Sequence, residues 1–142
     1  MAEISLRRAR TMIRKALEHA RGAEFKPMAV AVLDSGGNLI AFEREDGASP
    51  GRYEIARGKA YGAVMLGMPG SAQMARAEAQ AYFVACANGA PGGGMIPVPG
   101  GVLVKDSKGR VLGALGVTGD SSDNDAAAAK AGVEAAGLVA AV

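Results

Sequence analysis

Three side chains in the middle of the sequence have the types needed to bind a carboxylate or to move a proton: Arg44, Lys59 and Tyr61. Guanidinium and ammonium groups pair with carboxylate oxygens, and an amine or a phenol can exchange a proton with a substrate. Tyr53 and Tyr82 are equally eligible as phenolic donors by residue type. If Arg44 and Lys59 converge on a cleft, they predict a carboxylate site; if they are scattered, they belong to a solvated surface.

The chain has one histidine, His19, and one cysteine, Cys86. These counts exclude a disulfide within the chain, a two-histidine metal site and a thiolate zinc cluster. On a helical wheel His19 lies at the flank of an apolar stripe, which is typical of a half-buried surface residue. A lone imidazole beside an apolar cleft can also ligate haem iron, and that alternative stays open. Cys86 lies in an apolar segment, which favours a buried and inert thiol.

Glycine-rich and acidic segments give no phosphate or metal motif. Neither nucleotide-binding glycine pattern occurs in the sequence. Asp120, Asp123 and Asp125 crowd the start of the last predicted helix, where they would cap it and repel an anion. A calcium loop would require a glutamate where Ala131 stands. We therefore expect helix capping here and no metal site.

Length and composition indicate one globular domain covering residues 1–142. The 142 residues are 49% hydrophobic and 21% charged, and 16 basic against 14 acidic residues give a net charge of +2. This balance does not favour a nucleic-acid partner. No apolar run approaches the roughly 20 residues of a membrane span, and residues 1–8 do not resemble a signal peptide. We expect a soluble, cytoplasmic protein with neither a nucleic-acid nor a membrane partner.

Hydrophobic periodicity and turn residues divide the chain into helices and two hairpins. The predicted elements are a helix to residue 20 capped by Ser5, strands 28–33 and 39–43, helices 53–66 and 71–87, strands 102–104 and 111–117, and a helix from 122 to 140. Residues 122–125 resemble a capping box, and Gly113 and Gly116 predict a bulge or a close backbone approach. This order of elements predicts an α+β fold with an antiparallel sheet and no doubly wound sheet.

Several segments, taken together and in order, resemble the GlcG/HbpS-type haem-degrading-domain family, which also includes the C-terminal domain of PduO. The segments are VAVLDSGG (30–37), FEREDG (42–47), KAY (59–61), IPVPGGVL (96–103) and GALGVTGDSSDND (113–125). Each motif is weak by itself, whereas the ordered set covers nearly the whole chain and is specific.

The resemblance implies a five-stranded antiparallel sheet with helices on both faces, arranged as a profilin-like three-layer sandwich. It also implies a homo-oligomer, from a dimer to an octamer. Some family members bind haem, and others are encoded with genes for the catabolism of small organic acids or aromatic compounds. Haem is therefore the cofactor that the resemblance makes possible for this chain.

The resemblance also implies a set of site residues. The family's ligand pocket would be formed by Arg44, Lys59, Gly93, Gly94, Pro97, Gly100, Gly101, Thr118 and Gly119. His19 lies in the first-helix region where a relative has its histidine ligand to haem. Ala126 stands where many relatives carry a glutamate, so a reaction that needs this glutamate would be lost here.

Three functional hypotheses follow. The first is a small-molecule-binding protein of the GlcG/HbpS type, with haem as a possible ligand and His19 as its iron ligand. The second is a cofactor-independent isomerase, tautomerase or lyase in which Lys59 or Tyr61 transfers a proton, Arg44 orients a carboxylate substrate, and Thr118 with loop amides stabilises an enolate. The third is a scaffolding oligomer that binds no small molecule.

Overall fold

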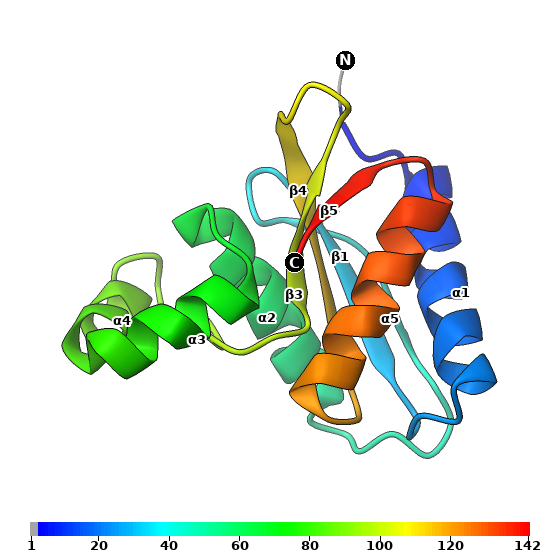
Figure 1. Cartoon of the computed structure of the whole chain (residues 1–142), viewed down its shortest axis with the longest axis horizontal. Helices are drawn as coiled ribbons and strands as arrows, with labels where there is room; N and C mark the ends of the chain where they lie inside the picture. The colour runs from blue at the N-terminus through cyan, green and yellow to red at the C-terminus, as the bar shows by residue number, and fades with distance from the viewer. Residues whose placement is uncertain (1–2) are drawn as a thin grey trace.

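The computed structural model describes residues 3–142 as one antiparallel sheet with helices on both faces (Figure 1). In chain order the elements are α1 (Leu6–Gly22), β1 (Ala29–Asp34), β2 (Leu39–Arg44), α2 (Arg52–Leu66), α3 (Gly70–Ala79), α4 (Ala81–Gly89), β3 (Gly101–Lys105), β4 (Val111–Thr118), α5 (Ser122–Ala135) and β5 (Val139–Ala141). The strand order is β2-β1-β4-β3-β5, and every neighbouring pair is antiparallel. Helices α1 and α5 cover one face of the sheet and α2 covers the other. The predicted α+β fold is confirmed.

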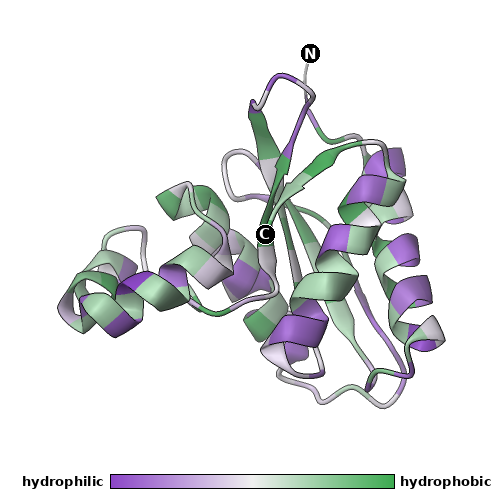
Figure 2. Cartoon of the chain, viewed as in Figure 1, coloured by the Kyte–Doolittle hydropathy of each residue, from purple (hydrophilic) through white to green (hydrophobic). Residues whose placement is uncertain are grey.

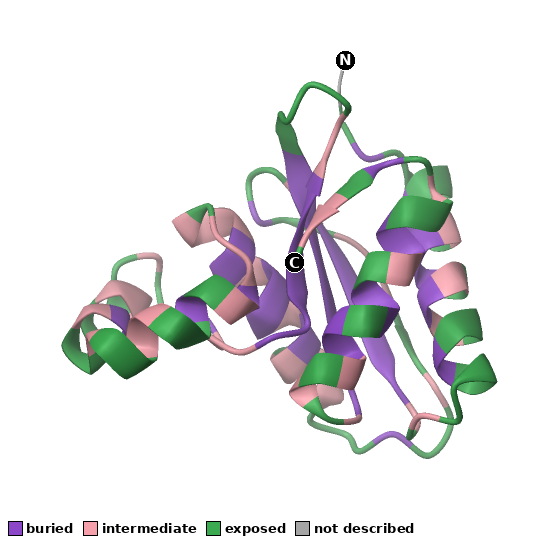
Figure 3. Cartoon of the chain, in the orientation of Figure 1, coloured by how far each residue is buried: buried purple, intermediate pink, exposed green. Residues whose placement is uncertain are grey.

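The two faces of the sheet carry side chains of different size. Large aliphatic side chains such as Val30 and Leu115 pack beneath α1 and α5 and form the main core. The face beneath α2 combines small residues, among them Ala114 and Gly116, with the buried Leu33 and Leu103. Figures 2 and 3 show hydrophobic, buried strands between helices whose outer faces are hydrophilic and exposed. The small residues let α2 lie unusually close to the sheet.

Two glycines show how close this approach is. A Cβ atom on Gly116 would overlap the carbonyl oxygen of Ala56 in α2, and one on Gly101 would overlap the backbone of Lys59. A Cβ on Gly113 would likewise overlap the carbonyl oxygen of Leu33 in the neighbouring strand. The close approach predicted at Gly113 and Gly116 is therefore confirmed.

The caps of the first and last helices differ in how well the sequence predicted them. The Ser5 hydroxyl accepts a hydrogen bond from the backbone N–H of Arg8 at 3.1 Å, as predicted. At α5 the cap is Ser121, whose hydroxyl accepts from the N–H of Asn124 at 3.2 Å, so a capping box starting at residue 122 is wrong by one position. The Asp125 carboxylate, which a capping box at residue 122 would need, is bonded to Lys59 and to the backbone N–H of Asp120.

The predicted helix 71–87 is two helices, α3 and α4, separated at Gln80. The Gln80 side chain bonds to Arg76 and Tyr82, and the Arg76 guanidinium lies 3.8 Å from the ring centre of Phe83. These contacts fold α4 back on α3, and the two helices project from the body of the molecule (Figure 1). Cys86 is therefore exposed on α4, and the expectation of a buried thiol is wrong.

The predicted helix 122–140 ends at Ala135, and residues 139–141 form the edge strand β5. Gly137 adopts a positive φ of 79°, and the N–H of Leu138 bonds to the carbonyl of Val133. This is the Schellman arrangement, which ends a helix and reverses the chain. Leu138 is then buried, and β5 pairs with β3. Nowhere in residues 3–142 is a helix both long and apolar enough to cross a membrane.

The close packing of α2 leads to a stability prediction. We expect Gly116→Ala to lower the free energy of unfolding by about 2–3 kcal/mol, because the added methyl group must push α2 away from β4. Chemical denaturation would measure the change. Gly22→Ala is the matched control, since a Cβ there meets no atom within 4 Å. Equal effects of the two substitutions would contradict the packing argument.

Candidate functional site

Lys59 lies on α2 and is buried, with only 3% of its surface exposed. Its Nζ atom donates to the carbonyl oxygen of Val117 at 3.1 Å and to Oδ2 of Asp125 at 2.9 Å. Gly100 and Gly101 pack directly against it. Lys59 lines none of the three hollows described below, so its donors hold the fold together here, and its role as a ligand contact stays a prediction.

Asp125 completes this buried pair. Its Oδ1 atom accepts from the backbone N–H of Asp120 at 2.9 Å, so both of its carboxylate oxygens are bonded. Burial lowers the pKa of Lys59 and raises the pKa of Asp125, while the attraction between the two charges opposes both shifts. The pair therefore sits where an unpaired charge would be strongly unfavourable.

Asp120, another acidic residue at this corner, accepts hydrogen bonds mainly from backbone N–H groups. Its carboxylate accepts from the N–H groups of Lys26 and Ser121 and from the amide of Asn124, and these bonds lower its pKa to about 2. The acidic segment thus fixes the start of α5 and the loop before β1. Among residues 3–142 no group of three or more His, Cys, Asp or Glu side chains could hold a metal ion.

Arg44, Thr118 and Gly119 lie at the same end of the sheet. Ala29 of β1 pairs with Arg44 of β2 on one side and with Thr118 of β4 on the other. Arg44 and Thr118 therefore lie in one row across the sheet, separated by two interstrand spacings, or about 10 Å. The Thr118 hydroxyl is buried and accepts from Nη1 of Arg52 at 2.8 Å. The register therefore brings these predicted residues near each other without forming one pocket.

Two separate hollows flank this row. A hollow of about 400 Å³, here the Arg44 hollow, is lined by Leu17, Arg21, Pro27, Glu43, Arg44, Glu45 and Asp46. A smaller one of about 220 Å³, here the Arg52 cavity, is lined by Lys26, Pro27, Gly47, Ala48, Ser49, Arg52 and Gly119. Lys26, Ser49 and Arg52 were not among the predicted site residues. Their signal in the sequence was weak, because each is a common surface residue type.

Tyr61 and part of the glycine-proline loop lie elsewhere. The Tyr61 hydroxyl donates to the carbonyl of Pro91 at 2.8 Å, and the Arg57 guanidinium lies 4.5 Å from the centre of its ring. The carbonyl of Gly94 packs against α2 at Gly58. Tyr61, Gly93, Gly94 and Pro97 line none of the three hollows, so their ligand and proton-transfer roles stay predictions.

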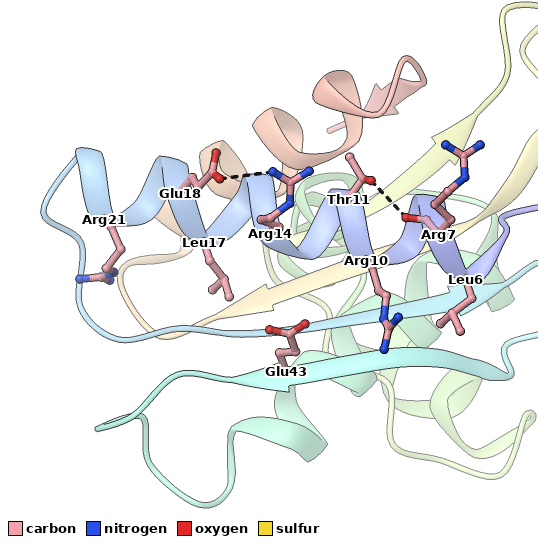
Figure 4. A pocket seen from close by; sticks show the side chains of 9 residues that line it. All are labelled: Leu6, Arg7, Arg10, Thr11, Arg14, Leu17, Glu18, Arg21 and Glu43. Carbon is pink, nitrogen blue, oxygen red and sulfur yellow. Dashed lines mark hydrogen bonds and ion pairs between the residues drawn. The ribbon is translucent and has the colours of Figure 1, made fainter.

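The largest of the three hollows runs along α1 beside β2, and sequence reasoning missed it (Figure 4). This α1 groove, of about 850 Å³, is lined by Leu6, Arg7, Arg10, Thr11, Arg14, Leu17, Glu18, Arg21 and Glu43. It shares Leu17, Arg21 and Glu43 with the Arg44 hollow, so the two are continuous. The signal in the sequence was the mixture of leucine and arginine on one helical face, which resembles an ordinary solvated surface.

The α1 groove combines apolar surface with free positive charge. Leu6 is 51% exposed, and Figure 4 shows Leu6, Arg10 and Leu17 pointing from α1 toward β2. Arg14 pairs with Glu18 at 3.6 Å. The side chains of Arg7 and Arg10, by contrast, make no hydrogen bond or ion pair with any of residues 3–142. Two guanidinium groups are thus available beside an apolar surface.

His19 does not line the α1 groove. It follows Leu17 by two residues, which is about 200° around the helix, and it is exposed near the end of α1 with its ring against Phe25 at 5.9 Å between centres. The only imidazole of the chain and the α1 groove are therefore on different sides of α1.

Comparison with known proteins identifies the family. The family model described as "Haem degrading protein HbpS-like" matches residues 4–134. The chain belongs to this family. A search of curated proteins gave no match. Among solved structures, a double mutant of Streptomyces reticuli HbpS is 32% identical, with a TM-score of 0.81 over 94% of this chain and 87% of that one.

Two further structures support the HbpS-like fold alone, since they are less than 25% identical. A PduOC:heme complex is 22% identical, with a TM-score of 0.84 over 96% of each chain. Klebsiella pneumoniae protein ORFY is 23% identical, with a TM-score of 0.84 over 94% of this chain and 90% of that one. The family model and the HbpS structure confirm the family expected from the ordered motifs.

The buried ion pair of this HbpS-like chain leads to a second prediction. We expect Lys59→Met and Asp125→Asn each to lower the free energy of unfolding by about 3–5 kcal/mol, because each leaves a buried charge without its partner. The double variant should lose clearly less than the sum, as chemical denaturation would show. The matched control is the exposed pair Lys130 and Glu134 on α5, where losses should stay below about 1 kcal/mol. Additive losses at Lys59 and Asp125 would contradict the coupling.

Proposed function

We propose that this HbpS-like chain binds haem, or a closely related amphipathic carboxylate, in the α1 groove. The observation that supports the proposal most directly is the pair of unpaired guanidinium groups, Arg7 and Arg10, beside the exposed Leu6. The family's description names haem, and one relative of the same fold is described as a heme complex. The groove is the part of this chain that best suits such a ligand.

Size and chemistry of the groove agree with a ligand of this class. A volume of about 850 Å³ lies within the roughly 300–1,000 Å³ of small-molecule sites. Leu6 and Leu17 would contact the apolar macrocycle, and Arg10, which lies on the same side of α1 in Figure 4, would pair with one propionate through its planar, bidentate donors. Arg7, whose guanidinium points the other way in that view, would turn toward the second propionate when the ligand binds. Haem, when bound, would supply an iron centre, whereas these residues hold and orient the ligand.

The lining of the groove fits the propionates better than the iron. It contains no His, Cys, Met or Tyr side chain, and its oxygen donors are Thr11, Glu18 and Glu43. Because His19 lies on the other side of α1, an imidazole ligand to haem iron in this groove would have to be the His19 of a second copy of the chain. Histidine ligation and self-association, from a dimer to an octamer, are therefore linked parts of the proposal.

An exposed apolar helix is consistent with self-association. Helix α4 carries no charged residue, and Val84 is its one buried residue while Tyr82 is 68% exposed. Apolar helices are normally covered in the functional assembly. A scaffolding role without a ligand would use the same surface, and the α1 groove is the feature that favours a binding protein.

The enzymatic alternative assigned proton transfer to Lys59 or Tyr61, and both groups are engaged in hydrogen bonds within the fold. The Nζ atom of Lys59 is buried between Val117 and Asp125, and the Tyr61 hydroxyl is bonded to Pro91. We therefore favour binding over catalysis. A cytoplasmic location remains an expectation from the sequence, and an association with the catabolism of small organic acids or aromatics remains one from the family resemblance.

The main test is a haemin titration followed by visible absorption. We expect saturable binding to the native protein and a loss of affinity of about tenfold or more in the variant Arg7→Ala/Arg10→Ala, which removes both propionate partners. The control variant Arg8→Ala/Arg110→Ala removes the same charge from residues outside the groove and should bind as the native protein does. Equal losses in both variants, or no saturable binding, would contradict the proposal.

A separate prediction concerns His19. If His19 ligates iron, His19→Ala should remove the shift of the Soret band that marks histidine ligation, while haemin still binds through Arg7 and Arg10. The spectrum of haemin bound to His19→Ala, recorded beside the native spectrum, measures this. An unchanged spectrum would exclude His19 as the ligand and leave an oxygen donor of the groove in that role.

A further inference from the structure

Arg52, in the first turn of α2, carries a positive charge that no carboxylate balances. Its Nε atom donates to the hydroxyl of Ser49 at 3.1 Å, and its Nη1 atom donates to the hydroxyl of Thr118 at 2.8 Å. Both partners are neutral, and within the described part of the chain Arg52 forms no ion pair. A half-buried guanidinium is thus held in a fixed position with donors to spare, since arginine has five N–H groups.

The surroundings of Arg52 are positive. Lys26 lines the same cavity, and no acidic residue is among the lining residues. The charge of Arg52 also contributes to lowering the pKa of the buried Lys59. Of the nearby carboxylates, Asp125 is paired with Lys59, whereas Asp120 accepts from neutral backbone donors and Asn124 and keeps a charge that attracts Lys26. An anion entering the cavity would therefore meet two cations and no carboxylate in the cavity wall, and Arg52 is the cation that no carboxylate balances.

We propose that the Arg52 cavity is a binding site for a small carboxylate, with the Arg52 guanidinium as its planar, bidentate donor and Lys26 as a second cation. The Ser49 and Thr118 hydroxyls preorganise the guanidinium, so little side-chain entropy is lost when the ligand binds. The site adds to the proposed function and does not depend on it, because the Arg52 cavity and the α1 groove share no lining residue.

The size of the cavity limits the ligand. About 220 Å³ is below the usual range for drug-sized molecules, so a carboxylate with a few non-hydrogen atoms fits and a macrocycle does not. Gly119 lines the cavity next to the carbonyl of Pro27, where a Cβ atom would overlap that oxygen. The wall is therefore tightly packed backbone, which favours a small ligand of defined shape.

The test is a titration with sodium acetate at constant ionic strength, followed through the backbone amide resonances of the protein. We expect saturable shifts at Ser49 and Gly119 with a dissociation constant of about 1–10 mM, which is typical for so small a ligand. Arg52→Met should weaken binding about tenfold or more, and Arg52→Lys, which keeps the charge and loses the planar fork, should weaken it less. The absence of saturable shifts up to about 100 mM acetate would overturn the proposal.

Two controls separate a specific site from general effects. Arg57→Met changes an arginine on the same helix that stacks on Tyr61 and lines none of the hollows, and it should leave acetate binding unchanged. Inorganic phosphate, titrated in the same way, tests for a site that takes any oxyanion. Equal weakening in Arg57→Met, or tighter binding of phosphate than of acetate at the same amides, would overturn the assignment.

A second variant keeps the test decisive if Arg52→Met does not fold. Lys26→Met changes an exposed cation whose side chain makes no hydrogen bond within residues 3–142, so folding should be retained. We expect it to weaken acetate binding about threefold, since one of two cations is lost. Unchanged binding in Lys26→Met together with unchanged binding in Arg52→Lys would contradict the role given to both residues.

Discussion

The ion pair between Lys59 and Asp125 connects the three layers of the molecule. Lys59 belongs to α2 on one face of the sheet, Asp125 belongs to α5 on the other, and the Val117 carbonyl at the end of β4 lies between them. The pair can form only because α2 lies almost on the sheet, over Gly116 and Gly101. The buried ion pair thus depends on small residues in β3 and β4. The pair in turn links α2 and α5 at the same end of the sheet.

The packing separates basic side chains that hold the fold together from basic side chains that can contact a ligand. Lys59 is neutralised in the interior, where a lone ammonium would be strongly unfavourable. Arg52 is held by two hydroxyls at the edge of a small cavity, and Arg7 and Arg10 stand free along α1. A net charge of +2 says nothing of this division. The positive charges that remain available to a ligand are those that form no ion pair with a buried carboxylate.

Local signals in the sequence were sufficient for most of the secondary structure. Ser5 marks the start of α1, the glycine turns mark both hairpins, and Gly116 indicates a close approach of backbones. The break at Gln80 had no such signal, because it depends on the hydrogen bonds of the Gln80 side chain to Arg76 and Tyr82 and on the packing of Arg76 over Phe83. Strand β5 is only three residues long, and its backbone donors and acceptors are satisfied by β3, which lies far away in the sequence.

By itself, the sequence determined the α+β class, the order of the helices and hairpins, and the family, because periodicity, turn residues and ordered motifs are local properties of the chain. Only the tertiary structure decided which polar residues are available to a ligand. Lys59 looked like a ligand contact and is buried in an ion pair, whereas Arg7, Arg10 and Arg52 looked ordinary and line hollows. The physical reason is that the availability of a charge depends on burial and on its partners, and those are set by helix packing and strand register across distant segments.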